Sequence, residues 1–180
     1  MKRQHPILLL LAAALLACPA MYGQFAATGT TTLSVTVGAE AALQVTTGTT
    51  TLAAAGTIFN PYLGTTNLVY KIRTTKSTGT GTITLKVTSD FSPAGGPSVA
   101  TPPTAGDALT YTCTVAAPGT GCSGSITSST AASTSVATFG AGASSANAGN
   151  AASTGWTLSN DPVYQTGAYS GVVTYTISAT

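Results

Sequence analysis

The chain has 180 residues and a formal net charge of +2, and only 6% of its residues are charged. The excess belongs to Lys2 and Arg3, since the remaining cations and acids balance: Lys71, Arg73, Lys76 and Lys86 against Glu40, Asp90, Asp107 and Asp161. Without a basic stripe, nucleic-acid binding is excluded as a function class. An apolar content of 43% and a mean hydropathy of +0.32 allow a packed core.

The first residues have the three parts of a secretion signal. Two cations follow Met1, an uncharged apolar run spans Ile7 to Ala17, and small and turn-forming residues come next. The run is about half the roughly 20 residues that a membrane-spanning helix needs. The sequence therefore predicts a signal peptide over residues 1–24 and one mature domain over residues 25–180, secreted or displayed at the cell surface.

Processing of this signal has three possible outcomes. A cut before Met21 and a cut near Gly23 or Gln24 both suit a small-residue cleavage site. The stretch Leu15 to Cys18 also resembles a bacterial lipoprotein box, in which Cys18 would be lipidated and would anchor the protein to the outer membrane.

Alternating apolar residues predict most of the mature chain as β-strands. Threonine and glycine are abundant, and no stretch keeps the helical period over three turns. The main runs are Leu33–Val37, Leu43–Val45, Leu68–Ile72, Ile83–Val87, Leu109–Val115 and Val173–Ile177, and weaker ones are Thr57–Asn60, Ser125–Ser128, Ser135–Phe139 and Trp156–Ser159. The low-complexity segment Gly140 to Gly155 is interpreted as a long flexible loop. Short strands between turn-rich stretches predict an all-β fold, an antiparallel immunoglobulin-like β-sandwich.

Two cysteines remain after the signal. Cys113 and Cys122 flank a segment that contains Pro118-Gly119, a strong turn signal. An even pair in an exported chain predicts a disulfide, and this one would staple the two arms of a hairpin.

The last strand resembles the C-terminal strand of chaperone–usher pilins and of secreted spore-coat-U-type domains. Gly167 is the fourteenth residue from the end, and with Tyr169 and Val173 it forms a G-x-Y-x-x-x-V lead-in. Val173, Tyr175 and Ile177 then alternate as a chaperone-binding face would. The resemblance implies a pilin-like sandwich that lacks a strand and assembles by strand donation, with a periplasmic chaperone and other copies of itself as partners.

In that reading, the alternating stretch Phe25 to Val37 at the mature N-terminus is the candidate donor strand. The alternative is that Phe25 to Val37 forms the first strand of a complete sandwich.

Enzymatic chemistry has little support in the mature sequence. The one histidine, His5, belongs to the signal, so neither a Ser-His-Asp nor a Cys-His arrangement is available. The aspartates stand singly, without the spacing of a calcium loop, and the cysteines are assigned to a disulfide. We therefore expect a non-enzyme without a metal or cofactor.

A cluster of aromatic residues supplies the rival hypothesis. Trp156, Tyr164 and Tyr169 lie close in sequence to Asn160 and Asp161, and sugar platforms combine aromatic faces with orienting polar groups. A lone tryptophan in a sandwich is also a common core anchor. The sequence thus favours an exported structural or adhesive surface protein, a fimbria-like subunit, with a monomeric module that binds surface glycans as the alternative.

Overall fold

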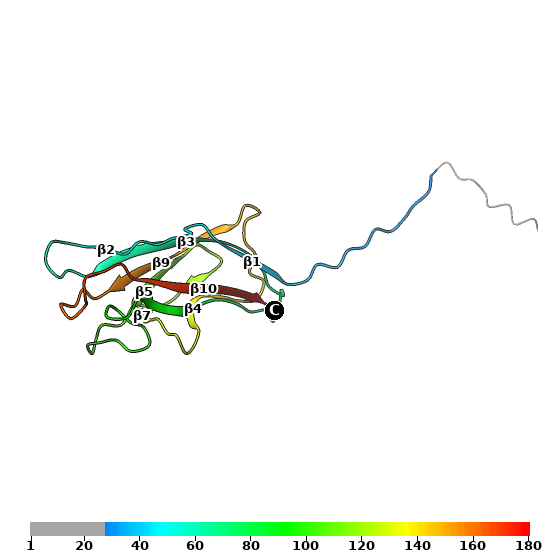
Figure 1. The fold of residues 1–180 in the computed structure, drawn as a ribbon. Coiled ribbons are helices and arrows are strands. Elements are labelled where there is room, and N and C mark those ends of the chain that lie inside the picture. Colours follow the sequence, from blue (N-terminus) through cyan, green and yellow to red (C-terminus); the bar gives the residue numbers. More distant parts are fainter. Residues whose placement is uncertain (1–27) are drawn as a thin grey trace, which may run out of the picture. The chain divides into compact units, whose positions relative to one another are not determined.

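A computed structural model describes residues 28–180 (Figure 1). The chain divides into two compact units, Met1–Thr36 and Val37–Thr180. The predicted signal peptide, its cleavage sites and Cys18 lie outside the described residues, as do the first residues of the candidate donor strand.

The described residues form ten strands and no helix, which confirms the all-β prediction. No helix among residues 28–180 is long and apolar enough to cross a membrane. The strands are β1 (Glu40–Val45), β2 (Ala53–Ala54), β3 (Tyr62–Arg73), β4 (Gly81–Ser92), β5 (Thr110–Val115), β6 (Thr120–Gly121), β7 (Ile126–Thr127), β8 (Thr134–Phe139), β9 (Asn150–Leu158) and β10 (Ser170–Ala179).

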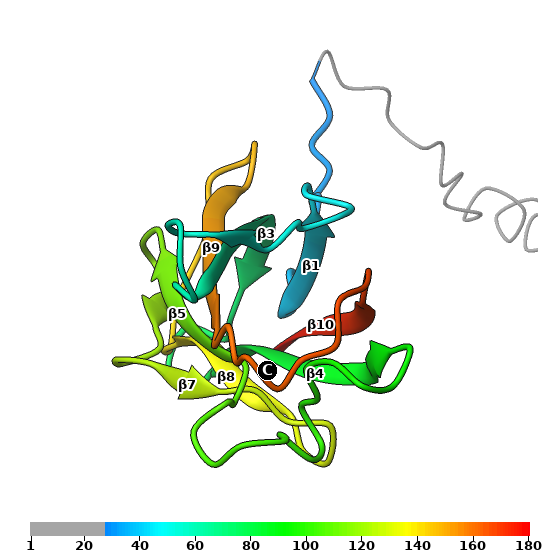
Figure 2. The ribbon, with the colours of Figure 1, turned by 60° about the vertical axis from the view of Figure 1, so that its left-hand side comes forward.

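The strands make two antiparallel sheets that face each other as a sandwich (Figures 1 and 2). Sheet A has the order β1-β3-β9-β5-β7, with β2 paired to the start of β3. Sheet B has the order β10-β4-β8-β6. As a result β1 ends one side of sheet A, and β10 ends the same side of sheet B (Figure 2).

The core is built by the alternation that the sequence shows. On β3 and β4 every second side chain points inward, which a strand requires because its side chains alternate between faces. Tyr70 and Phe139 meet in the core with ring centroids 5.1 Å apart. The fully buried large side chains are Tyr70, Tyr111, Leu68, Ile83, Leu85 and Val136, together with the hydroxyl-bearing Thr154.

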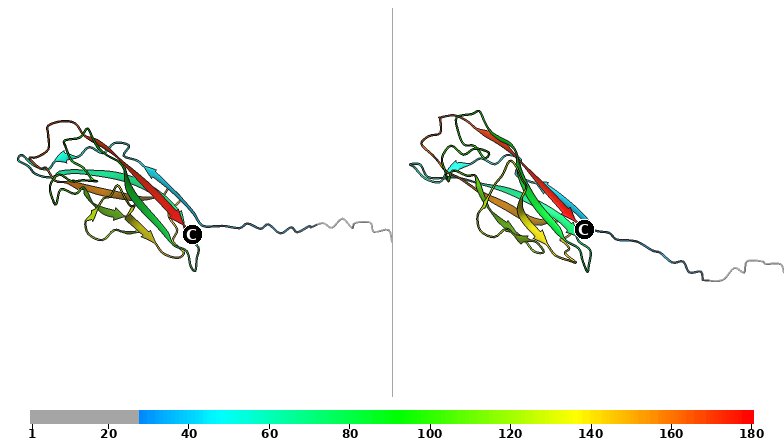
Figure 3. Two further views of the ribbon diagram at one scale, coloured as in Figure 1. Left: turned by 60° about the horizontal axis from the view of Figure 1, so that its bottom comes forward. Right: turned by 90° about the horizontal axis from the view of Figure 1, so that it is seen from below.

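The sandwich has two distinct ends (Figure 3). The terminal pole holds the start of β1, the end of β3, the connection of residues 74–80 and the C-terminus; there Glu40 pairs with Arg73, and the Thr75 N–H donates to the Thr180 carbonyl. The loop pole holds residues 55–61, 93–107 and 159–169. The first and the last of these segments lie together because Tyr62 pairs with Leu158.

The prediction of a flexible loop over Gly140 to Gly155 is wrong in its second half. Residues Asn150 to Gly155 belong to β9, which lies between β3 and β5 in the middle of sheet A. Ala152 and Thr154 point inward from this strand. Small side chains suffice there because Tyr70 and Tyr111 on the neighbouring strands fill the core, and they leave the strand without a visible apolar signal.

Other predicted strands have mixed outcomes. Ser125–Ser128 contains β7, Ser135–Phe139 covers all of β8 but Thr134, and Trp156–Leu158 are the last residues of β9, so these predictions are confirmed. Thr57–Asn60 is wrong, because it is a bend in which Phe59 has a φ of 48°. Leu33–Val37 is also not a paired strand in the described part of the chain.

The predicted disulfide between Cys113 and Cys122 is present, with the two Cα atoms 5.3 Å apart. The expectation that this bond staples the two arms of a hairpin is wrong, however, because the two cysteines belong to different sheets. Cys113 lies in β5 of sheet A, whereas Cys122 follows β6 and its N–H donates to Val136 in sheet B. The bond therefore ties the two layers together, and it is of the kind that persists in oxidising compartments.

One carboxylate organises a loop of the loop pole. Asp90 accepts hydrogen bonds from the N–H groups of Phe91, Val99 and Ala100 at 2.8, 2.7 and 3.1 Å, and from the Ser98 hydroxyl at 2.7 Å. Burial alone would raise the pKa of Asp90, but these hydrogen bonds to the charged form outweigh it and lower the pKa.

This capping predicts a pH-dependent contribution to stability. A carboxyl with a lowered pKa stabilises the fold above its unfolded pKa of about 3.9, and this contribution is lost as the pH falls through the folded pKa. We expect Asp90→Asn to cost about 1 kcal/mol at neutral pH, since the site is partly exposed, and the gap to wild type to close in acid. Denaturant unfolding across pH 2–7 measures it. A gap that stays constant with pH would contradict a role of the charge.

Candidate functional site

A groove of about 960 Å³ opens between the free edges of the two sheets, over the half of the sandwich that ends at the loop pole. Its walls come from β3 and β9 on one side and from β4 and β10 on the other, with loops 47–52 and 160–169 at its rim. Such a volume is at the upper end of the range of ordinary ligand pockets.

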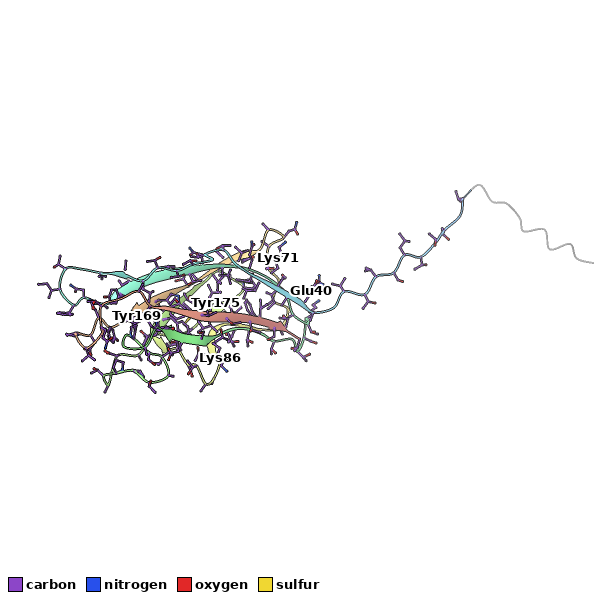
Figure 4. All side chains as sticks on the ribbon, in the orientation of Figure 1. Glu40, Lys71, Lys86, Tyr169 and Tyr175 are labelled. Atoms are coloured by element: carbon purple, nitrogen blue, oxygen red, sulfur yellow. A yellow bond between two sulfur atoms is a disulfide. The ribbon has the colours of Figure 1, made fainter. Side chains whose placement is uncertain are left out.

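One side of the groove is the edge strand β10. Within residues 28–180, β10 pairs with β4 alone, so the backbone groups along its other edge have no strand partner. Val173, Tyr175 and Ile177 point inward and pack against the core, as the alternation predicts. Figure 4 shows Tyr175 midway along the strand, between Glu40 at the terminal pole and Tyr169 at the loop pole.

The opposite side is open because β1 is short. β1 ends at Val45, whose ladder partner is Leu68, so the first half of β3 has no residue of β1 beside it. The chain instead leaves the sheet through a threonine-rich loop and returns only at β2. The sandwich therefore lacks a full-length edge strand at this position.

The floor of the groove carries hydroxyl groups that are already paired. The Tyr175 hydroxyl lies 2.6 Å from Thr154 Oγ1, and Trp156 Nε1 donates to Thr66 Oγ1 at 2.9 Å. Thr66 in turn shares a hydrogen bond of 2.6 Å with Thr50. Burial raises the pKa of Tyr175, so the phenol stays neutral. Because these hydroxyl groups are hydrogen-bonded to their neighbours, this part of the floor suits apolar contact with a bound segment and not proton transfer.

Trp156 is a core residue. Its side chain is 5% exposed, and its ring packs on that of Tyr111 with centroids 5.4 Å apart. The Tyr111 hydroxyl bonds to Thr134 and to the Ser135 carbonyl, both at 2.8 Å, which fixes the ring pair. Trp156 therefore lines the groove as a nearly covered core side chain and not as an open platform.

A polar cluster lies at the mouth of the groove. The Tyr164 hydroxyl donates to Asp107 Oδ2 at 3.0 Å, and burial together with this carboxylate raises the pKa of Tyr164. Hydrogen bonds from Thr104 and from the Val163 N–H lower the pKa of Asp161. These two aspartates, far apart in sequence, meet at the loop pole, and both serve as turn and capping residues.

The segment that precedes β1 differs from the rest of the described chain. Residues 28–39 have no regular secondary structure, and Leu33 and Val35 are 91% and 85% exposed. Large alternating apolar side chains in water are unfavourable unless another surface covers them. The expectation that this segment is the first strand of a complete sandwich is therefore not met in the residues described.

Most of the residues that the sequence singled out meet at this one groove: Gly167, Val173, Tyr175, Trp156, Tyr164 and Tyr169 all line it. Ile177 lies farther along β10, and the disulfide is elsewhere. Sequence reasoning missed Val45, Leu52 and Thr66. The inward alternation at the start of β3 (Tyr62, Gly64, Thr66) was the one available signal.

No group of three or more potential metal ligands occurs in the part of the chain described. Comparison of the chain with family models, with curated proteins and with solved structures found no match.

Proposed function

We propose that this protein is an exported structural subunit that assembles by strand donation, in which the N-terminal segment of one copy fills the groove of another. The observation that carries the proposal is that two features of the chain each lack a partner in the described residues and could complement each other. An exposed alternating segment, Leu33 to Val37, precedes in sequence a domain whose edge strand β10 borders an open apolar groove. Strand addition to a free sheet edge is an established mode of recognition.

The two parts match in length. The groove borders β10 from Ser170 to Tyr175, and the segment Thr32 to Val37 has the same number of residues. At about 3.3 Å per residue each spans roughly 20 Å. Leu33, Val35 and Val37 share one face of an extended strand, so all three can enter the groove while the hydroxyl side chains between them face out.

The energy of this insertion is substantial. Burying a Val or Leu side chain is worth about 1.5–3 kcal/mol, so three of them contribute about 5–9 kcal/mol before ladder hydrogen bonds and ordering costs. Pairing also satisfies the backbone groups at the free edge of β10, which an uncovered edge exposes to indiscriminate association. A periplasmic chaperone that covers the groove before assembly would meet the same need.

The segment is poorly suited to fill the groove of its own chain. Folding back through a two-residue turn at Gly38–Ala39 would set Val35 opposite Ala42 and Leu33 opposite Gln44. Directly opposite residues lie on the same face of a sheet. Ala42 and Gln44 are on the exposed face of β1, so this hairpin would turn the apolar side chains to water.

A three-residue turn would correct the facing but disturb β1. Such loops commonly end in a left-handed residue, which here would be Glu40. Glu40 is instead paired with Arg73 in the β1–β3 ladder, and its Oε2 lies 3.1 Å from Arg73 Nη2. The acceptor of the segment is therefore a second copy of the chain.

A monomeric glycan-binding module is the second candidate, since the groove also contains Tyr164 and Tyr169. Sugar platforms rely on an open aromatic face. Trp156 is buried against Tyr111, and the Tyr169 hydroxyl bonds to the Gln165 carbonyl. This arrangement favours strand donation over a platform.

Deletion of Phe25 to Val37 tests the proposal. We expect the wild-type protein to form multimers under non-denaturing conditions and the shortened protein to be monomeric, because the donor is lost while the acceptor remains. Size-exclusion chromatography with light scattering measures both. Added peptide of the deleted sequence should bind the shortened protein and raise its melting temperature, as a ligand of the folded state does.

Two results would contradict strand donation. The first is a wild-type protein that stays monomeric at high concentration and binds a glycan. The second is a shortened protein that still forms the same multimers. An unchanged circular dichroism spectrum of the shortened protein serves as the control that the domain remains folded.

A further inference from the structure

We propose that consecutive copies also bind through their ends, the cationic terminal pole of one against the anionic, apolar-tipped loop pole of the next. This contact rests on the strand donation proposed above and adds a second interface to it. Three features of the described residues carry it: a short linker, a separation of charge along the sandwich, and an exposed apolar loop.

The linker leaves the donor copy little freedom. Val37 is the last apolar residue of the donor segment, and Glu40 begins β1, so only Gly38 and Ala39 lie between them. Val37 and Glu40 are therefore three residue steps apart, and these span at most about 11 Å when fully extended. Gly38 is moreover held at the terminal pole, because Arg73 Nε donates to its carbonyl at 2.7 Å. The terminal pole of the donor copy must therefore lie against the mouth of the groove that it fills.

The charged side chains are sorted by pole. The terminal pole carries Lys71, Arg73 and Lys76 with one acidic side chain, Glu40, a side-chain charge of 3 − 1 = +2, which the carboxylate of Thr180 at the same pole lowers to +1. The loop pole carries Asp90, Asp107 and Asp161 and no cation, a side-chain charge of −3. Lys86 lies between the poles, opposite Thr174, as Figure 4 shows for its place on β4. The side-chain charges of the described residues sum to zero but are separated along the sandwich.

This charge separation selects the direction of the donor strand. If the donor runs antiparallel to β10, its C-terminal end emerges at the loop pole, and the cationic pole of the donor copy meets the anionic pole of the acceptor. A parallel donor would set two terminal poles, both cationic, against each other. Complementary charge steers association, and like charges in contact oppose it. Every ladder in both sheets is also antiparallel.

The loop pole also has an apolar tip. Ile58 and Phe59 are 76% and 60% exposed, and Phe59 holds a left-handed conformation that is rare for a bulky residue. Phe59 lines the groove, so the tip is continuous with the surface that the donor strand would occupy. An apolar centre bordered by charges is the usual composition of a protein interface. Because the two contacting surfaces differ, the contact is heterologous, and copies joined by it form a fibre unless the rotation between them closes a ring.

Charge reversal tests the contact. Monomers released by denaturant are diluted at low salt, and multimer growth is followed by light scattering. We expect Lys76→Glu and Asp161→Lys each to slow growth about 10-fold, and the double variant to recover much of the rate, because it restores opposite charges across the contact. Asp161→Asn keeps the oxygen that accepts from the Val163 N–H, and it should slow growth less. Lys86→Glu, midway between the poles, is the matched control and should have no effect.

The outcomes separate this inference from strand donation. Wild-type growth that no charge variant alters, at low or high salt, would overturn the pole-to-pole contact and leave donation standing. Faster growth of Lys76→Glu alone would overturn it as well. A wild-type protein that forms no multimers would overturn both.

Discussion

Replacing Trp156 by alanine is expected to lower the free energy of unfolding by about 3–5 kcal/mol, the range for removing a large aromatic side chain from a core. The indole is 5% exposed, packs on Tyr111 and donates to Thr66. The cavity left by the indole would open into the groove between the two sheets, so few neighbouring side chains could move in to fill it. For a domain of this size the loss corresponds to about 6–20 °C in melting temperature, measured by circular dichroism.

Tyr169→Ala provides the matched control. This ring also lines the groove, but it is at the loop pole and its hydroxyl bonds only to the nearby Gln165 carbonyl. We expect its removal to shift the melting temperature far less than that of Trp156. If Trp156→Ala instead melted like the wild type and lost binding to a glycan, the tryptophan would be a ligand platform, and the assignment of the groove to a protein strand would be wrong.

The fold class could be predicted from the sequence because the longest strands carry the clearest alternation. β3, β4 and β10 display large apolar residues at every second position, and these same residues form the core. β9 could not be predicted in the same way. Its inward positions are Ala152 and Thr154 before Trp156, and such small residues look like a low-complexity loop although they occupy the middle of a sheet.

Residues of the candidate site could be predicted from the sequence, but their convergence on one groove could not. The alternating pattern indicated Val173 and Tyr175 as residues of an assembly strand, whereas the aromatic cluster indicated Trp156 as part of a glycan site. Only the pairing of strands shows that all three border one groove. The groove itself arises because β1 ends at Val45, and the length of an edge strand is a tertiary property that no local pattern reports. The separation of charge by pole is hidden in the sequence for the same reason.

The strongest effect on assembly is expected from Leu33, Val35 and Val37 replaced together by threonine. Threonine favours extended structure but puts a hydroxyl in place of apolar atoms, so the segment keeps its strand preference and loses its apolar face. With about 1.5–3 kcal/mol at stake for each side chain, we expect the affinity between copies to fall by at least 1,000-fold. Light scattering at micromolar concentration should then detect monomers only.

The intervening positions supply the control for this experiment. Thr32, Ser34 and Thr36 alternate with the three apolar residues and would face away from the groove, so replacing them by valine should leave assembly intact. The paired results depend on strand geometry alone, because the two triple variants lie within the same six residues and differ only in which face changes. Equal loss of multimers in both variants would mean that the segment acts through nonspecific apolar contact or through its flexibility. The proposal that the groove binds one face of an extended strand would then be wrong.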